Sequence, residues 1–112
     1  EAEMNAFANV DEQVLRKLKE ESDEITAAFA KTIGQAADST LVQELTQKHY
    51  NSINQIQSLI AGKKVIMDYD MYVKMANSVD HVEIRELCEH YGEGYAEHAR
   101  AAMIYYAEKN LK

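Results

Sequence analysis

The chain of 112 residues contains no proline, no tryptophan and only four glycines. Proline and glycine interrupt helices more than any other residue, so their scarcity allows long helices. No segment shows the alternation of polar and apolar residues that is typical of a strand. The length suits one domain. The sequence therefore predicts an all-α fold with a single helical core.

Cysteine is also scarce, since Cys88 is the only one, and no disulfide can form within the chain. No secretory signal pattern is visible, so we expect a reducing, cytoplasmic location. The longest uncharged stretch, residues 50–62, is too short and too polar to span a bilayer. We therefore expect no membrane partner.

Basic residues are few: 12 Lys and Arg stand against 19 Asp and Glu, which gives a net charge of −7. Phosphate binding depends on clustered Lys and Arg, and here only Lys63 and Lys64 are adjacent. This argues against nucleic acid as a direct partner of this chain. The chain begins with Glu1 and not with Met, so we expect it to be a piece of a longer protein. Residues 1–9 would form an arm or linker end, and residues 10–112 the helical domain.

Apolar residues recur at helical spacing in two long segments. The first predicted helix covers residues 10–34, ends at Gly34, and has one apolar face formed by Val14, Leu18, Ile25, Phe29 and Ile33. The second begins at a cap within residues 38–40 and ends near residue 61. Its stripe consists of Leu41, Leu45, His49, Ile53, Ile56 and Ile60.

Three shorter helices are predicted in the second half. One covers residues 66–77 and places Met67, Met71 and Met75 one turn apart on a single face. The next follows a cap at Ser78 or Asp80 and has a face formed by Ile84, Leu87, Cys88 and Tyr91. After a break at residues 92–94, the last covers residues 95–111 and is rich in alanine, which lets another helix approach closely.

Methionine and tyrosine are concentrated between residues 67 and 106, which hold four of the five methionines and six of the seven tyrosines. Methionine fills irregular apolar space, and tyrosine adds a large apolar ring with a hydroxyl group that needs a partner. Such residues suit a cavity for a bulky organic ligand and equally suit an ordinary core. His49, on an apolar stripe, is either a hydrogen-bonded core residue or a ligand contact.

Known catalytic and metal-binding patterns are absent from the sequence. The residues three positions before His49, His81, His90 and His98 are not acidic, so the Glu-x-x-His pairs of di-iron bundles are missing. Cys88 has no base on its own helix face and reads best as a small buried residue. We therefore expect no enzyme activity, no metal and no cofactor.

Two segments resemble a known family. Ser39-Thr-Leu-Val-Gln43 with Leu45, His49 and Ile53 is similar to the middle of the TipAS-type antibiotic-recognition domain, the C-terminal effector part of MerR-family transcriptional activators. Gly94-Tyr-Ala96, with Ala102, Met103 and Tyr106, looks like that family's closing segment. Asp23-Glu-Ile25, Ala28 and Phe29 resemble its first helix.

The resemblance implies an all-helical, globin-like fold without haem. It also implies binding of thiopeptide or other peptide-like antibiotics in a groove between helices. Ligand capture would activate an upstream DNA-binding domain, within a homodimeric regulator, or would sequester the drug. DNA would then be contacted only through that missing upstream domain.

From these observations we expect a drug-sensing effector domain that holds a hydrophobic or peptide-like antibiotic in an interhelical cleft. The candidate ligand-binding residues are His49, Ile53, Met71, Tyr72, Met75, Tyr91 and Tyr95. The alternative is a helical protein–protein interaction module that docks a partner helix on the Met and Tyr surface. A metal-dependent enzyme of the bundle type is a third reading.

Overall fold

The computed structural model describes residues 12–112, and every regular element in that range is a helix. The elements are α2 (Glu12–Ala30), α3 (Thr40–Ala61), α4 (Tyr69–Asn77), the 3₁₀ turn η1 (Ser78–Asp80), α5 (Val82–Glu89) and α6 (Tyr95–Asn110). The prediction of an all-α domain with two long and three shorter helices is confirmed. The predicted arm at residues 1–9 and the first two residues of the first predicted helix lie outside the described residues.

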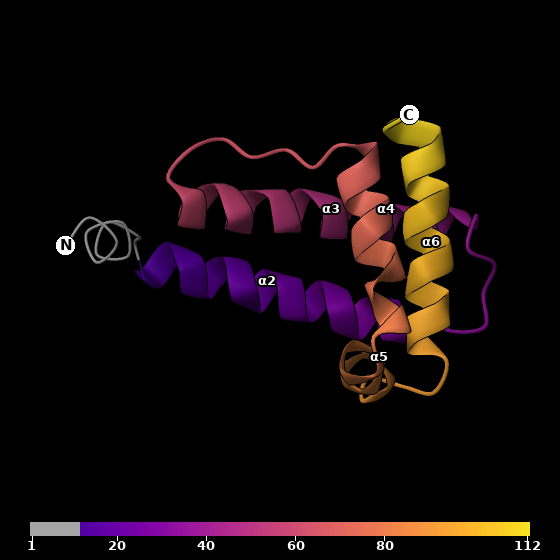
Figure 1. Ribbon diagram of the computed structural model, residues 1–112. Coiled ribbons are helices and arrows are strands. Elements are labelled where there is room, and N and C mark those ends of the chain that lie inside the picture. The colour runs from indigo at the N-terminus through magenta and orange to yellow at the C-terminus, as the bar shows by residue number, and fades with distance from the viewer. Residues whose placement is uncertain (1–11) are drawn as a thin grey trace.

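The helices form two antiparallel pairs that cross. The long helices α2 and α3 lie side by side, and α4 and α6 run together across one end of that pair, with α5 at the foot of α6 (Figure 1). A connector, residues 62–68, runs back along α3 before α4 begins. The other ends of α2 and α3 extend beyond α4 and α6, so the molecule measures 46 × 30 × 26 Å.

Short polar side chains determine where the helices begin and end. Ser39 caps α3 by accepting a hydrogen bond from the Val42 N–H, within the cap region that the sequence predicted. Gly62 ends α3 with φ 70°, a left-handed conformation that glycine adopts without steric cost. Asp68 caps α4 by accepting from the Met71 N–H at 2.9 Å. The predicted start of this helix at residue 66 is therefore wrong, and Met67 lies in the connector.

Two other predicted boundaries are also wrong. The first helix ends at Ala30 and not at Gly34, because hydrogen bonds from residues 31–33 to the carbonyl three positions back tighten the last turn. Neither Ser78 nor Asp80 caps α5. Both belong to η1, and His81 precedes α5 without a side-chain cap.

The core has two centres. One contains Phe29, Val42, Leu45 and Ala102, where α2, α3 and α6 meet. The other is a cluster of three tyrosine rings, Tyr50, Tyr72 and Tyr106, whose centroids lie 5.0–6.0 Å apart. The predicted stripe on α3 is only partly correct, since Leu41 and Ile60 are each 48% exposed. Tyr50 is buried in their place, because the α3 face toward α4 and α6 also carries core residues.

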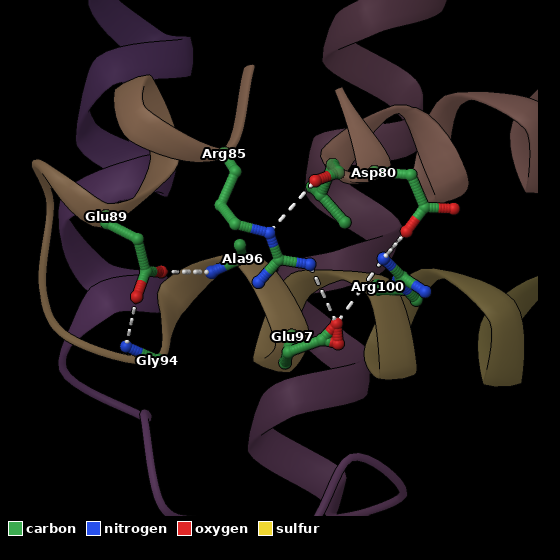
Figure 2. A network of polar contacts seen from close by, with 8 residues as sticks. Asp80, Arg85, Glu89, Gly94, Ala96, Glu97 and Arg100 are labelled. Atoms are coloured by element: carbon green, nitrogen blue, oxygen red, sulfur yellow. Dashed lines mark hydrogen bonds and ion pairs between the residues drawn. The ribbon is translucent and has the colours of Figure 1, made fainter. Parts of the chain in front are cut away.

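Polar contacts attach α5 to α6 (Figure 2). The Arg85 side chain donates to the Val79 carbonyl and pairs with Glu97 at 3.2 Å, while Arg100 pairs with Asp80 and Glu97. The Glu89 carboxylate accepts from the Gly94 and Ala96 N–H groups, both at 2.9 Å, and so satisfies free donors at the start of α6. No residue of α5 is buried.

Changing Glu89 to glutamine should lower the melting temperature at neutral pH, because the amide lacks the charge and the second acceptor oxygen that cap α6. The two backbone hydrogen bonds lower the pKa of Glu89 below its ordinary value of 4.5. A carboxyl group with a lowered folded-state pKa stabilises the fold above its unfolded-state pKa, and this contribution is lost as the pH falls.

Thermal melts of the wild type and Glu89→Gln should therefore differ at neutral pH and converge below pH 4.5. Glu86→Gln, on the exposed side of the same helix, is the matched control and should melt like the wild type. An equal effect of both substitutions would contradict the capping role.

Candidate functional site

The structure separates the seven predicted site residues into several places. His49 and Tyr95 line one small cavity, and Tyr72 is completely buried behind His49. Ile53 packs, partly buried, against the tyrosine cluster. Met71 and Met75 border a separate depression on α4, together with Met67, Lys74 and Ser78. The exposed Tyr91 ring stacks at a tilt on Tyr95, with centroids 5.4 Å apart.

The cavity beside His49 lies between α2, α3 and α6. Its walls are Ile25, Thr26, Phe29, Thr46, His49, Tyr95, Ala99 and Met103, and its volume is about 30 Å³. A buried water needs roughly 10–15 Å³ by this measure, so the cavity has room for about two waters. Drug-sized ligands need pockets of roughly 300 Å³ or more. In this conformation the cavity is too small for an antibiotic.

His49 has the environment of a hydrogen-bonded core residue. Its Nδ1 lies 2.9 Å from the Tyr72 hydroxyl oxygen. Burial lowers the pKa of His49 from 6.5 to about 4, because the charged imidazolium would lose its hydration. The imidazole is therefore neutral at physiological pH, and the Tyr72 hydroxyl supplies its polar partner.

A larger surface feature lies where the connector runs along α3. Three α3 side chains at four-residue intervals hold the connector. The Tyr50 hydroxyl donates to the Met67 carbonyl, the Asn54 Oδ1 accepts from the Met67 N–H at 3.0 Å, and Ser58 bonds both the N–H and the carbonyl of Val65. Residues four apart lie on one side of a helix, so these side chains form a continuous row.

Between this row, the connector and the first half of α2 lies an open groove of about 790 Å³, which we call the connector groove. Its lining consists of Val14, Leu18, Tyr50, Asn51, Asn54, Gln55, Ser58, Leu59, Lys64, Val65 and Ile66. Among the apolar residues, Val14 is 44% exposed and Ile66 is 58% exposed. The exposed amides of Asn51 and Gln55 make no hydrogen bond within residues 12–112. The groove therefore combines accessible apolar surface with free donors and acceptors.

Comparison with models of known protein families identifies the family to which the chain belongs. The TipAS antibiotic-recognition domain matches residues 1–106. The chain belongs to this family. No curated protein and no solved structure matches the chain. The resemblance seen in the sequence is thereby confirmed, and with it antibiotic recognition as the role of the domain.

The connector groove of this TipAS domain contains none of the seven residues that the sequence analysis selected. Apolar periodicity and the concentration of methionine and tyrosine, on which that prediction rested, mark the core as strongly as a binding surface. A signal for the groove was present: Tyr50, Asn54 and Ser58, and likewise Asn51 and Gln55, recur at four-residue spacing along α3. The second wall could not be read in the same way, because it comes from α2 and the connector.

The other groups of the TipAS domain that could react or bind a metal are Cys88 and the His, Asp and Glu side chains. Cys88 is half-buried, and burial, followed by the nearby Glu89 charge, raises the pKa of its thiol above 9.0. This disfavours the thiolate, which is the nucleophilic form. Within residues 12–112, no three His, Cys, Asp or Glu side chains converge on a common point as metal ligands would. Nor does any helix in that range have the length and apolar character needed to cross a membrane.

The lowered pKa of His49 predicts a loss of stability on mild acidification. The unfolded state takes up a proton below pH 6.5, whereas folded His49 resists protonation down to about pH 4. Its contribution is therefore complete above pH 6.5 and is lost as the pH falls toward 4. The free energy involved is at most about 3 kcal/mol. Burial also lowers the pKa of His98, which acts in the same direction.

Urea unfolding at a series of pH values between 7 and 5 measures this effect. His49→Gln should reduce the slope of the unfolding free energy against pH, and His90→Gln, at an exposed position, should leave it unchanged. An unaltered slope in His49→Gln would show that other groups cause the pH dependence.

The attachment of the connector to α3 should depend on the Asn54 side chain. Asn54→Ala leaves the Met67 N–H without its partner and should lower the free energy of unfolding by about 1–3 kcal/mol. Asn51→Ala removes an exposed amide of the same type on the same helix and should change it by less than about 0.5 kcal/mol. Urea unfolding measures the free energy of unfolding of both variants. An equal loss in the two variants would show that the hydrogen bond from the Met67 N–H to Asn54 does not stabilise the fold.

Proposed function

We propose that this chain is the drug-sensing effector domain of a cytoplasmic MerR-type transcriptional regulator, and that it binds a hydrophobic or peptide-like antibiotic in the connector groove. Binding would bias an upstream DNA-binding domain, in a homodimer, toward activation, or would sequester the drug. The domain would act by binding and not by catalysis. Membership of the TipAS family supports the ligand class.

The observation that carries the placement is the composition of the connector groove. Its volume of about 790 Å³ falls within the range of drug-sized sites, roughly 300–1,000 Å³, as does the depression on α4 at about 460 Å³, so the lining residues distinguish the two. Leu18, Leu59 and Ile66 offer apolar surface, while Asn51 and Gln55 each offer an amide that can both donate and accept. A peptide-like antibiotic presents the complementary combination of apolar side groups and amide bonds.

Affinity in such a groove would come mainly from burial of apolar area. The gain is about 25 cal/mol per Å² before the loss of translational freedom is subtracted. Each amide–amide hydrogen bond would add about 1 kcal/mol and would set the orientation of the ligand. Because Asn51 and Gln55 lie one turn apart, roughly 5–6 Å between Cβ atoms, they can pair with alternate peptide groups of one extended ligand.

Isothermal titration with a thiopeptide antibiotic tests the placement. Ile66→Ser should weaken binding about tenfold, because it removes an exposed apolar side chain from the groove wall. The double change Asn51→Ala and Gln55→Ala should also weaken it about tenfold, through the loss of two hydrogen bonds. Both changes are at exposed positions and should leave the melting temperature of the free protein nearly unaltered.

The double change Met71→Ala and Met75→Ala is the matched control, because both residues belong to the ligand site predicted from the sequence and lie outside the groove. It should leave the affinity unchanged. Weaker binding in this variant, with normal binding in the groove variants, would move the site to α4. Absence of binding by the wild type to every peptide-like antibiotic tried would contradict the proposed ligand class.

A further inference from the structure

On its inner side, helix α5 places Arg85 and Glu89 beside the half-buried Ile84 and Cys88, while its outer side carries exposed apolar residues. Val82 is 66% exposed, Leu87 is 69% exposed, and Tyr91, just beyond the helix, is 53% exposed. Arg85 and Glu89 extend from α5 toward η1 and α6, where they make the contacts that attach the helix (Figure 2). The exposed apolar residues are therefore not needed to hold α5 in place.

The outward side of α5 mixes these apolar residues with acidic ones. Successive residues of a helix are turned by about 100°, so Glu86 and Glu83 lie between Val82 and Leu87 around the helix. Tyr91 follows Leu87 by one turn. We call the surface formed by Val82, Glu83, Glu86, Leu87 and Tyr91 the α5 outer face.

Its carboxylates are not neutralised by the fold. Glu83 and Glu86 form no ion pair within residues 12–112, and neither does Glu93 in the following turn. The one arginine of this helix, Arg85, pairs with Glu97, while Arg100 pairs with Asp80 and Glu97. The α5 outer face therefore presents negative charge together with apolar surface.

We propose that the α5 outer face is a docking site for an amphipathic helix of a partner protein whose apolar stripe is flanked by Lys and Arg. Val82, Leu87 and Tyr91 would contact the apolar stripe, and Glu83 and Glu86 would pair with the flanking cations. Three of the eight exposed large apolar residues in the described range lie on this one face, and such clustering marks interaction sites where singly exposed apolar residues do not. Opposite charges favour encounter and fix the orientation.

The same charges argue against the other occupants of this surface. A second copy would bring Glu83 and Glu86 close to carboxylates of the same kind, in a chain whose net charge is already −7. Anionic lipid surfaces and nucleic acids would be repelled for the same reason. The depression beside Met71 on α4 has no comparable charge pattern, since its only charged residue is Lys74.

The test uses a model peptide of about 18 residues, long enough for five turns, with Leu at helical spacing and Lys elsewhere. Binding to the full chain is measured by isothermal titration and mapped by NMR chemical-shift changes. Two reference peptides are a version with Glu in place of Lys and a scrambled version of the Lys peptide. We expect the Lys peptide to bind at least about tenfold more tightly than either, with shifts centred on residues 82–91.

Variants of the protein sharpen the test. The double change Val82→Ser and Leu87→Ser should weaken binding of the Lys peptide about tenfold, and Glu83→Lys with Glu86→Lys should reverse the preference toward the Glu peptide. Met71→Ser, on the exposed part of α4, is the matched control and should bind normally. Raising the salt to about 1 M, where the Debye length is about 3 Å, should weaken the wild-type complex.

No discrimination between the peptides, or shifts centred on the connector groove or on α4, would overturn this assignment. So would a failure of the wild type to bind the Lys peptide. If the free chain dimerises, and the double variant Val82→Ser and Leu87→Ser does not, the occupant of the α5 outer face is a second copy of the chain and not a partner helix. Antibiotic binding is tested separately, because the groove variants at Ile66, Asn51 and Gln55 leave α5 unaltered.

Discussion

The hydrogen bonds between α3 and the connector are the contacts on which much of the structure depends. Tyr50, Asn54 and Ser58 hold residues 65–67 against α3. The connector in turn brings Met67 into the core and Asp68 to the start of α4, so that Tyr72 reaches the tyrosine cluster. The same contacts make the connector a wall of the groove. One row of polar side chains therefore supports both the core and the proposed ligand surface.

Polar groups in this protein differ in whether the fold supplies their partners. His49 and Tyr72 satisfy each other in the interior, which agrees with the high cost of an unpaired buried polar group. Asn51 and Gln55 remain without partners in the described part of the chain, at an apolar groove that solvent reaches. Groups of the first kind stabilise the fold, whereas those of the second kind are available to a ligand. This difference favours the groove over the His49 cavity as the antibiotic site.

The two proposed surfaces are attached to the fold in different ways. The groove is lined by residues of the two long helices and the connector. Helix α5 lies at the foot of α6 (Figure 1). Helix α5 is held by ion pairs, by capping contacts and by the half-buried Ile84 and Cys88, so Val82 and Leu87 can remain exposed. Under the two proposals the drug and the partner protein would bind at separate surfaces, so that either site could change with little effect on the other.

The sequence alone determined the helical class, the number of helices, the family and several helix ends, because each rests on local signals. The cap at Ser39, the stop at Gly62 and the break at residues 92–94 act within a single turn of the chain. Tertiary structure alone decided which faces became core, that Met67 would leave its predicted helix, and where a groove would form. The lining joins Val14 on α2, Gln55 on α3 and Ile66 on the connector. Such a site depends on how segments distant in the sequence pack together, and the periodicity within one segment does not predict that packing.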